Sequence, residues 1–75
     1  MPLKLNAEKV RYVLLADGWH EVAFADGKST FDVDSYEFVE GSPTAGASWK
    51  EKKGEFEHRV MCSLTSVLAV QERVD

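Results

Sequence analysis

Residues 49–67, WKEKKGEFEHRVMCSLTSV, decide the fold. Residues 56–62 alternate between two sets of side chains with period two, which is the pattern of a half-buried strand. The pair Lys53-Gly54 comes just before them, and its glycine supplies the positive φ that a tight hairpin turn needs. Residues 63–66 are typical of a single helical turn. The stretch therefore predicts a hairpin, then a helical turn, then a last short strand.

The same signals extend toward the N-terminus. Asp17-Gly18 and Asp26-Gly27 are isolated turn signals between apolar stretches. The spacing predicts strands over residues 10–15, 19–24, 36–40, 47–52, 56–62 and 67–71. Residues 41–48 contain only Gly, Ser, Pro, Thr and Ala, so we expect a plain flexible linker there.

Two of the segments have a helical alternative. Asn6 is a good N-cap for a helix that would begin at residue 7, and Ser63 could cap a helix over residues 64–73. A strand is favoured for the first segment because β-branched and aromatic side chains follow one another there. For the second, both structures remain open, and a helical turn followed by a short strand is the preferred interpretation.

A chain of 75 residues is close to the lower size at which a hydrophobic core alone can hold a fold. We therefore expect one domain over residues 1–75, with a thin core and no deep cavity. The predicted core residues are Val13, Val22, Phe38, Val60 and Val67.

Five or six short strands in so short a chain predict a mainly β fold that closes into a small barrel, because closure hides the strand edges. The order of Trp49, Gly54, Phe56, Val60 and residues 64–67 resembles the second half of an SH3-like barrel, with a 3-10 turn before the last strand. The resemblance implies a fold. It does not imply binding of proline-rich peptides, because the aromatic start of the peptide-binding SH3 domains and their proline in the 3-10 region are both missing.

The whole chain also resembles small proteins of actinobacteria and their phages. Residues 15–20, LADGWH, and residues 64–70, LTSVLAV, carry this resemblance. It implies no activity.

The charges lie unevenly along the chain, whose net charge is −4. Residues 17–40 contain many acids and a single base, Lys28. The main basic group consists of Lys50, Lys52, Lys53 and Arg59, with Glu51, Glu55 and Glu57 interleaved. Binding to duplex nucleic acid needs clustered bases that neutralise phosphates, so we expect no such partner.

Catalytic chemistry is not expected. Cys62 and His58 lie on one face of the predicted strand but about 13 Å apart at the strand rise, which is beyond hydrogen-bond reach. One cysteine and two histidines cannot supply a tetrahedral zinc site. The acids Asp32, Asp34 and Glu37 are interpreted as a solvated face of a strand. We therefore predict a protein that is not an enzyme, with no catalytic, cofactor-binding or metal-binding residues.

Three residues are candidates for a binding surface: Trp19, His20 and Trp49. Exposed aromatic side chains are common anchors in protein interfaces. The alternative is that both tryptophans belong to the core. We expect a binding module whose partner is a protein or a second copy of the chain. The runner-up is a nucleic-acid-linked role, through Lys50, Lys52, Lys53 and Arg59 or through mimicry of nucleic-acid charge by the acidic half.

The sequence favours a cytoplasmic protein without a membrane partner. Cys62 is its single cysteine, so no disulfide can form within the chain. The first residues contain no apolar signal segment, and no apolar run approaches the roughly 20 residues of a membrane helix.

Overall fold

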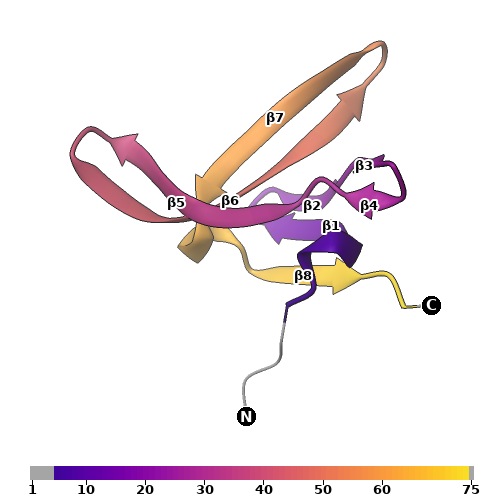
Figure 1. Cartoon of the computed structure of the whole chain (residues 1–75), viewed down its shortest axis with the longest axis horizontal. Helices are drawn as coiled ribbons and strands as arrows, with labels where there is room; N and C mark the ends of the chain where they lie inside the picture. Colours follow the sequence, from indigo (N-terminus) through magenta and orange to yellow (C-terminus); the bar gives the residue numbers. More distant parts are fainter. Residues whose placement is uncertain (1–4, 75) are drawn as a thin grey trace.

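The computed structural model describes residues 5–74, and short antiparallel strands make up most of it (Figure 1). The strands are β1 (Val10–Leu15), β2 (Gly18–Glu21), β3 (Phe24–Ala25), β4 (Lys28–Ser29), β5 (Asp32–Val39), β6 (Ser42–Lys53), β7 (Phe56–Ser63) and β8 (Ala69–Glu72). Two 3-10 turns, η1 (Ala7–Lys9) and η2 (Leu64–Ser66), precede β1 and β8. The sheets have the strand orders β2-β1-β8, β3-β4 and β5-β6-β7. The mainly β class is thus confirmed.

The predicted turns are confirmed at the positions where the residues favour a positive φ. Gly54 has a φ of 65° between β6 and β7. Between β3 and β4, Asp26 and Gly27 have φ values of 54° and 78°, the two positive values that a tight hairpin turn requires. The helical turn before the last strand is η2, and the first segment forms the strand β1 rather than a helix.

The strand predicted over residues 19–24 is wrong in its second half, because the chain changes partner there. The Val22 amide donates to the Arg11 carbonyl of β1, whereas the Ala23 amide donates to the Lys50 carbonyl of β6. The chain therefore leaves the first sheet at residue 22. The short hairpin β3-β4 follows.

The linker predicted over residues 41–48 is also wrong, since residues 42–48 form the first part of β6. This strand has β5 on one side and β7 on the other, and Ala47 pairs with both Val33 and Cys62. Close packing explains the absence of a side chain at position 46. A Cβ atom on Gly46 would lie 2.6 Å from Cδ2 of Tyr36 and 3.1 Å from Cε2 of Phe38.

The core is built mainly from residues of β1 and β6, and Trp49 is its largest member at 1% exposure. The buried apolar residues are Val10, Val13, Val22, Phe31, Ala47 and Trp49. Val13 and Val22 are confirmed as core residues, while Val60 and Val67 are half-buried and pack against the core.

The prediction for Phe38 is wrong: its side chain is 44% exposed. It lies at an irregularity in the pairing of β5 with β6, between Glu37 and Val39. The hairpin has already left the core at this point, so period-two alternation no longer places a side chain inside the molecule.

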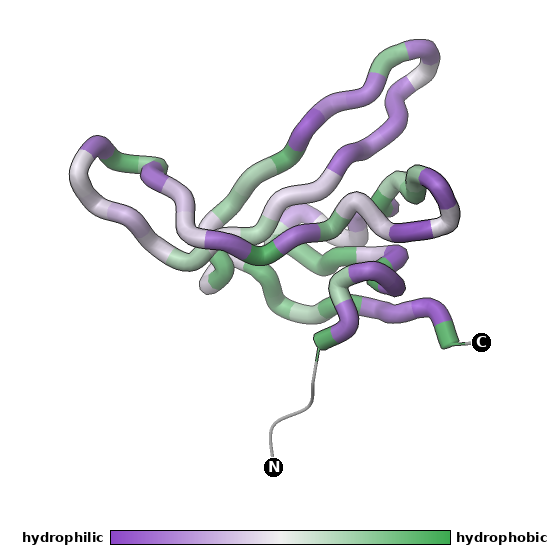
Figure 2. The backbone as a smooth tube through the Cα atoms, viewed as in Figure 1, coloured by the Kyte–Doolittle hydropathy of each residue, from purple (hydrophilic) through white to green (hydrophobic). Residues whose placement is uncertain are grey.

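The predicted closure into a small barrel is wrong, because the described strands form three separate sheets, β2-β1-β8, β3-β4 and β5-β6-β7. Two hairpin arms, β5-β6 and β6-β7, extend in different directions from the body, and β6 belongs to both (Figure 1). Hydrophobic residues gather where the strands cross, and the arms are largely hydrophilic with isolated hydrophobic positions (Figure 2). No helix within residues 5–74 is long and apolar enough to cross a membrane.

Candidate functional site

The turn before β2 directs His20 and Trp19 to opposite faces of the sheet β2-β1-β8. His20 pairs with the buried Val13, whereas Trp19 pairs with Leu14, which lies on the other face of β1. Successive residues of a strand alternate between faces, so these neighbours have different surroundings. His20 points toward β6 and Trp19 points to solvent.

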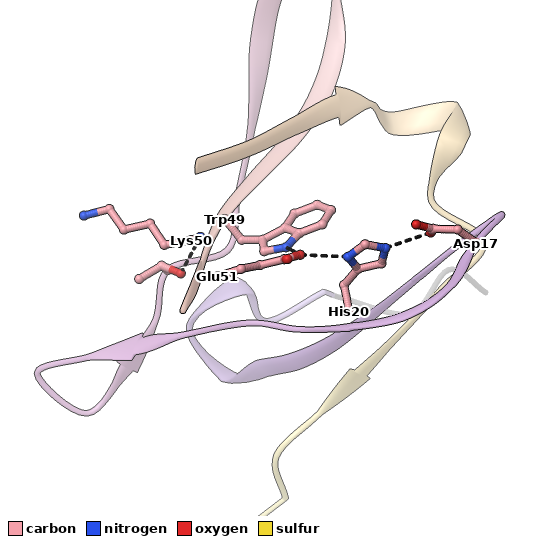
Figure 3. Close-up of polar contacts among 6 residues, drawn as sticks. Asp17, His20, Trp49, Lys50 and Glu51 are labelled. Carbon is pink, nitrogen blue, oxygen red and sulfur yellow. Dashed lines mark hydrogen bonds and ion pairs between the residues drawn. The ribbon is translucent and has the colours of Figure 1, made fainter. Parts of the chain in front are cut away.

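His20 is the centre of a polar chain that joins the first turn to the core (Figure 3). Its Nε2 lies 2.7 Å from Oδ1 of Asp17, and its Nδ1 lies 2.8 Å from Oε2 of Glu51. The indole nitrogen of Trp49 donates to the same Glu51 oxygen at 2.8 Å. The His20 and Trp49 rings also meet edge to face, with centroids 6.4 Å apart.

The hydrogen bond with Asp17 raises the pKa of His20 above its ordinary value, and the bond to Glu51 adds to this rise against the opposing effect of burial. The same bond with His20 lowers the pKa of Asp17. The imidazolium form is therefore favoured, and both of its ring N–H groups donate to carboxylates.

This geometry makes the hydrogen-bonded side chains a structural clamp, which consists of Asp17, His20, Glu51 and Trp49. Both ring nitrogens of His20 are engaged, so neither can accept a proton from a nucleophile. Glu51 is 7% exposed and receives hydrogen bonds from Trp49 and His20, which compensates for its burial. The clamp ties the Asp17 turn and β2 to β6.

The other residues considered for catalysis or metal binding lie apart from one another. His58 is exposed on β7, as predicted for a strand histidine. Cys62 is half-buried against the core, and burial raises the pKa of its thiol, which favours the unreactive protonated form. Asp32 and Asp34 are exposed. Within residues 5–74, no group of three or more His, Cys, Asp or Glu side chains could hold a metal ion.

The three residues predicted for a binding surface do not form one surface, although His20 and Trp49 are in contact. Trp49 is in the core and contacts His20, whereas Trp19 is 49% exposed on the opposite face of its sheet. Sequence reasoning missed Glu51. Its position two residues after Trp49 places both side chains on one face of β6, and this spacing was the available signal of a carboxylate near the core.

Trp19 belongs to an outer apolar face that sequence reasoning also missed. Leu14 pairs with Trp19 on one side and with Ala69 on the other, and Tyr12 lies on the same face two residues before Leu14. A shallow notch of about 270 Å³ is lined by Tyr12, Trp19 and Gln71. Two aromatic side chains therefore border one hollow on a hydrogen-bonded sheet.

A larger open cleft, of about 570 Å³, extends around Val22 and Ala23, where the chain passes from β1 to β6. Its lining contains the bases Arg11, Lys52 and Arg73 and the acids Glu21 and Glu51. Glu51 is already bound to the clamp. Because side chains of both charges line the cleft, it favours neither an anionic nor a cationic ligand.

A scan of family models, a search of curated proteins and a search of solved structures found no match to this chain. The resemblances to SH3-like barrels and to actinobacterial and phage proteins therefore remain predictions.

Proposed function

We propose that the chain is a small, non-enzymatic binding module whose partner is a protein, with Trp19 as the anchor of the interface. The observation that carries the proposal is the notch between Tyr12 and Trp19 on the outer face of β2-β1-β8. Tryptophan and tyrosine are the residues most enriched at the energetic centres of protein interfaces. About half of the Trp19 surface is exposed and can contact a partner.

The face is held in place before any partner binds. Tyr12 lies on β1, which is paired on both sides, and Leu14 fills the row between Trp19 and Ala69. Aromatic side chains have few rotamers to lose, and a hydrogen-bonded strand has little backbone freedom to lose. The entropy cost of binding at this face is therefore small.

The surroundings of the notch favour an extended protein segment. β2 is an edge strand, so its outer backbone groups are available to pair with another strand. Tyr12 pairs with Glu21 on one side and with Gln71 on the other, so polar side chains and no base lie beside it in the register, which suits a protein surface better than a polyanion. We infer a segment that pairs with β2 and inserts one apolar side chain between Tyr12 and Trp19.

The order of elements supports an SH3-like relationship as part of this proposal. A three-stranded meander, β5-β6-β7, leads into the 3-10 turn η2, and the last strand β8 then pairs with the first strand β1. This order supports the resemblance over the C-terminal third, whereas the open sheets differ from a closed barrel. A reducing compartment such as the cytoplasm also belongs to the proposal, since Cys62 has no second cysteine to pair with.

Panning a random-peptide display library against the folded chain tests the proposal. We expect enriched peptides with a common apolar position, and we expect Trp19→Ala to weaken their binding at least about tenfold, as for an interface anchor. Phe56→Ala is the matched control, because Phe56 is 68% exposed at the tip of a distant hairpin. Equal binding by the Trp19→Ala variant would contradict the proposal.

A nucleic-acid-linked role is the second candidate, and the cross-strand pair Lys50 and Arg59 favours it. The next pair on the same face of the hairpin, Lys52 and Glu57, has no net charge, which limits the phosphate-binding surface. Titration of labelled duplex and single-stranded oligonucleotides separates the two roles. Micromolar binding that falls steeply with salt and is lost in a Lys50→Glu, Lys52→Glu, Lys53→Glu variant would make this role the better account.

A further inference from the structure

Trp19 and His20 are neighbours on β2 and connect the notch of the proposed function with the clamp. Trp19 borders the notch on the outer face of the sheet, whereas His20 points the other way and is held between Asp17 and Glu51 (Figure 3). The strand β2 has four residues and a sheet neighbour on one side, so few contacts hold it in place. A change in the clamp therefore acts directly on the strand that carries Trp19.

The two carboxylates that hold His20 differ in their exposure to water. The side chain of Glu51 is 9% exposed, whereas that of Asp17 is 72% exposed. A buried carboxylate that loses a donor is left without hydration, but an exposed carboxylate binds water in its place. The hydrogen bond to Asp17 is therefore the one that can be exchanged for water at little cost.

The protonation state of His20 decides whether its ring can hold both carboxylates. The imidazolium form donates from both nitrogens, whereas the neutral ring has one N–H group and one lone pair. The remaining proton stays on Nδ1, because the buried Glu51 needs the donor more than Asp17 does. Nε2 then presents its lone pair to the Asp17 oxygen, which lies 2.7 Å away in this structure. Two acceptors repel each other, so loss of the proton releases the turn that carries Asp17.

The other charged and titratable groups nearby act on the two partners of His20. The positive charge of Lys53 on β6 favours the ionised form of Asp17. His58 of β7 pairs with Glu51 across the hairpin and is exposed. From β1, the apolar Val13 pairs with His20. The link between the Asp17 turn and β6 therefore passes through the His20 ring.

We propose that the proton on His20 controls the affinity of the Tyr12–Trp19 notch for its partner, with the Asp17 turn as the switch. The inference rests on the proposed function, because it concerns binding at that notch. With the proton in place, the clamp holds the turn and Trp19 in the position that borders the notch. Without it, this position is less populated, and the observed affinity falls in proportion to the populated fraction. Because the pKa of His20 is raised, the fall comes on the alkaline side of 6.5.

The pH dependence of peptide binding tests the inference. The probe is a peptide selected against the parent, with blocked ends and no titratable side chain, and its affinity is measured from about pH 6 to about pH 9. We expect the affinity of the parent to fall at least about threefold toward the alkaline end. By linkage, bound peptide should raise the pH midpoint of the His20 ring signals in a proton NMR titration. His58→Gln is the matched control and should show the same fall as the parent.

Two substitutions of Asp17 separate a proton switch from a merely structural contact. The amide of Asp17→Asn can accept from the protonated Nε2 and donate to the neutral one, so this variant should keep its acidic-side affinity over the whole range. Asp17→Ala has neither group, so it should bind at every pH about as weakly as the parent does at the alkaline end. Asp17 does not have a positive φ, so both side chains fit the backbone of the turn.

The outcomes distinguish failure of the switch from failure of the proposed function. A parent that binds through Trp19 with equal affinity at both ends of the range would overturn the switch alone. The same holds if Asp17→Asn loses affinity with pH as the parent does, or if bound peptide leaves the His20 midpoint unchanged. A parent that binds no peptide, or binds it no better than Trp19→Ala does, would overturn the proposed function and the switch with it.

Discussion

The indole nitrogen of Trp49 donates a hydrogen bond to the carboxylate of Glu51, two residues along the same strand, at 2.8 Å. Glu51 is among the few buried polar residues of the described chain, and its bonding oxygen also faces His20. A carboxylate in so thin a core is stabilised only while both donors are present. The core and the first hairpin are thereby linked through one side chain.

Removal of this carboxylate should therefore be costly. Glu51→Ala leaves the Trp49 indole N–H and one His20 N–H without their acceptor, and we expect it to lower the free energy of unfolding by about 1–3 kcal/mol. Urea unfolding followed by circular dichroism measures the change. Glu57→Ala is the matched control, since Glu57 is exposed on β7, and its effect should stay within about 0.5 kcal/mol. Equal effects would show that the clamp contributes nothing.

The clamp should also make stability depend on pH. The pKa of His20 is raised above its ordinary value of 6.5 in the folded chain, so its contribution is complete below that value and is lost as pH rises through the folded pKa. The pKa of Asp17 is lowered from 3.8, so its contribution is present above that value and is lost as pH falls through the folded pKa.

We therefore expect stability to decline on the alkaline side of 6.5 in the parent, and this decline to vanish in His20→Gln. Chemical unfolding at a series of pH values gives the profile. His58→Gln removes the other histidine, which is exposed on β7, and should retain the decline. A profile that is the same in the parent and His20→Gln would exclude the clamp as its source.

Gly46 should tolerate no larger residue. The Cβ atom of Gly46→Ala would lie 2.6 Å from the Tyr36 ring and 2.9 Å from the Cys62 carbonyl oxygen, which is backbone and cannot move freely. We expect a loss of about 1–3 kcal/mol in the free energy of unfolding, as for overpacking. The neighbouring exposed position provides the control, Ala45→Ser, which should be nearly neutral. A neutral Gly46→Ala would show that the rings do not rest on this glycine.

Cys62 should react slowly with thiol reagents in the folded chain. Its side chain packs against the core and burial raises the pKa of its thiol, so the reactive thiolate is scarce at neutral pH. The rate of labelling by an aromatic disulfide, with and without urea, measures this. Labelling as fast in buffer as in urea would contradict the packing of Cys62.

Sequence reasoning succeeded where local chemistry decides the structure. The turns at Gly18, Gly27 and Gly54 and the 3-10 turn Leu64–Ser66 follow from residues next to one another in the chain, and each was predicted. Successive β-branched and aromatic residues located β1, and period-two alternation located β7.

Sequence reasoning failed where contacts between distant segments determine the structure. Residues 41–48 have the composition of a linker, but Gly46 among them has to be small because the rings of Tyr36 and Phe38 lie against it. Phe38 was predicted in the core because alternation cannot show where a hairpin leaves the body. The role of Glu51 depends on His20, which is 31 residues away in the chain. Contacts between such distant segments leave no pattern in the sequence next to each residue.

The most direct test of the binding module observes the two tryptophans separately, because their indole N–H groups give distinct signals in a nitrogen–proton correlation spectrum. Titration with a peptide selected against the parent should shift the Trp19 indole signal and leave that of Trp49, which is buried and bonded to Glu51, nearly unchanged. Shifts should extend to the backbone amides of β2. Peptide binding that leaves the Trp19 signal and the β2 amides unmoved would contradict the account.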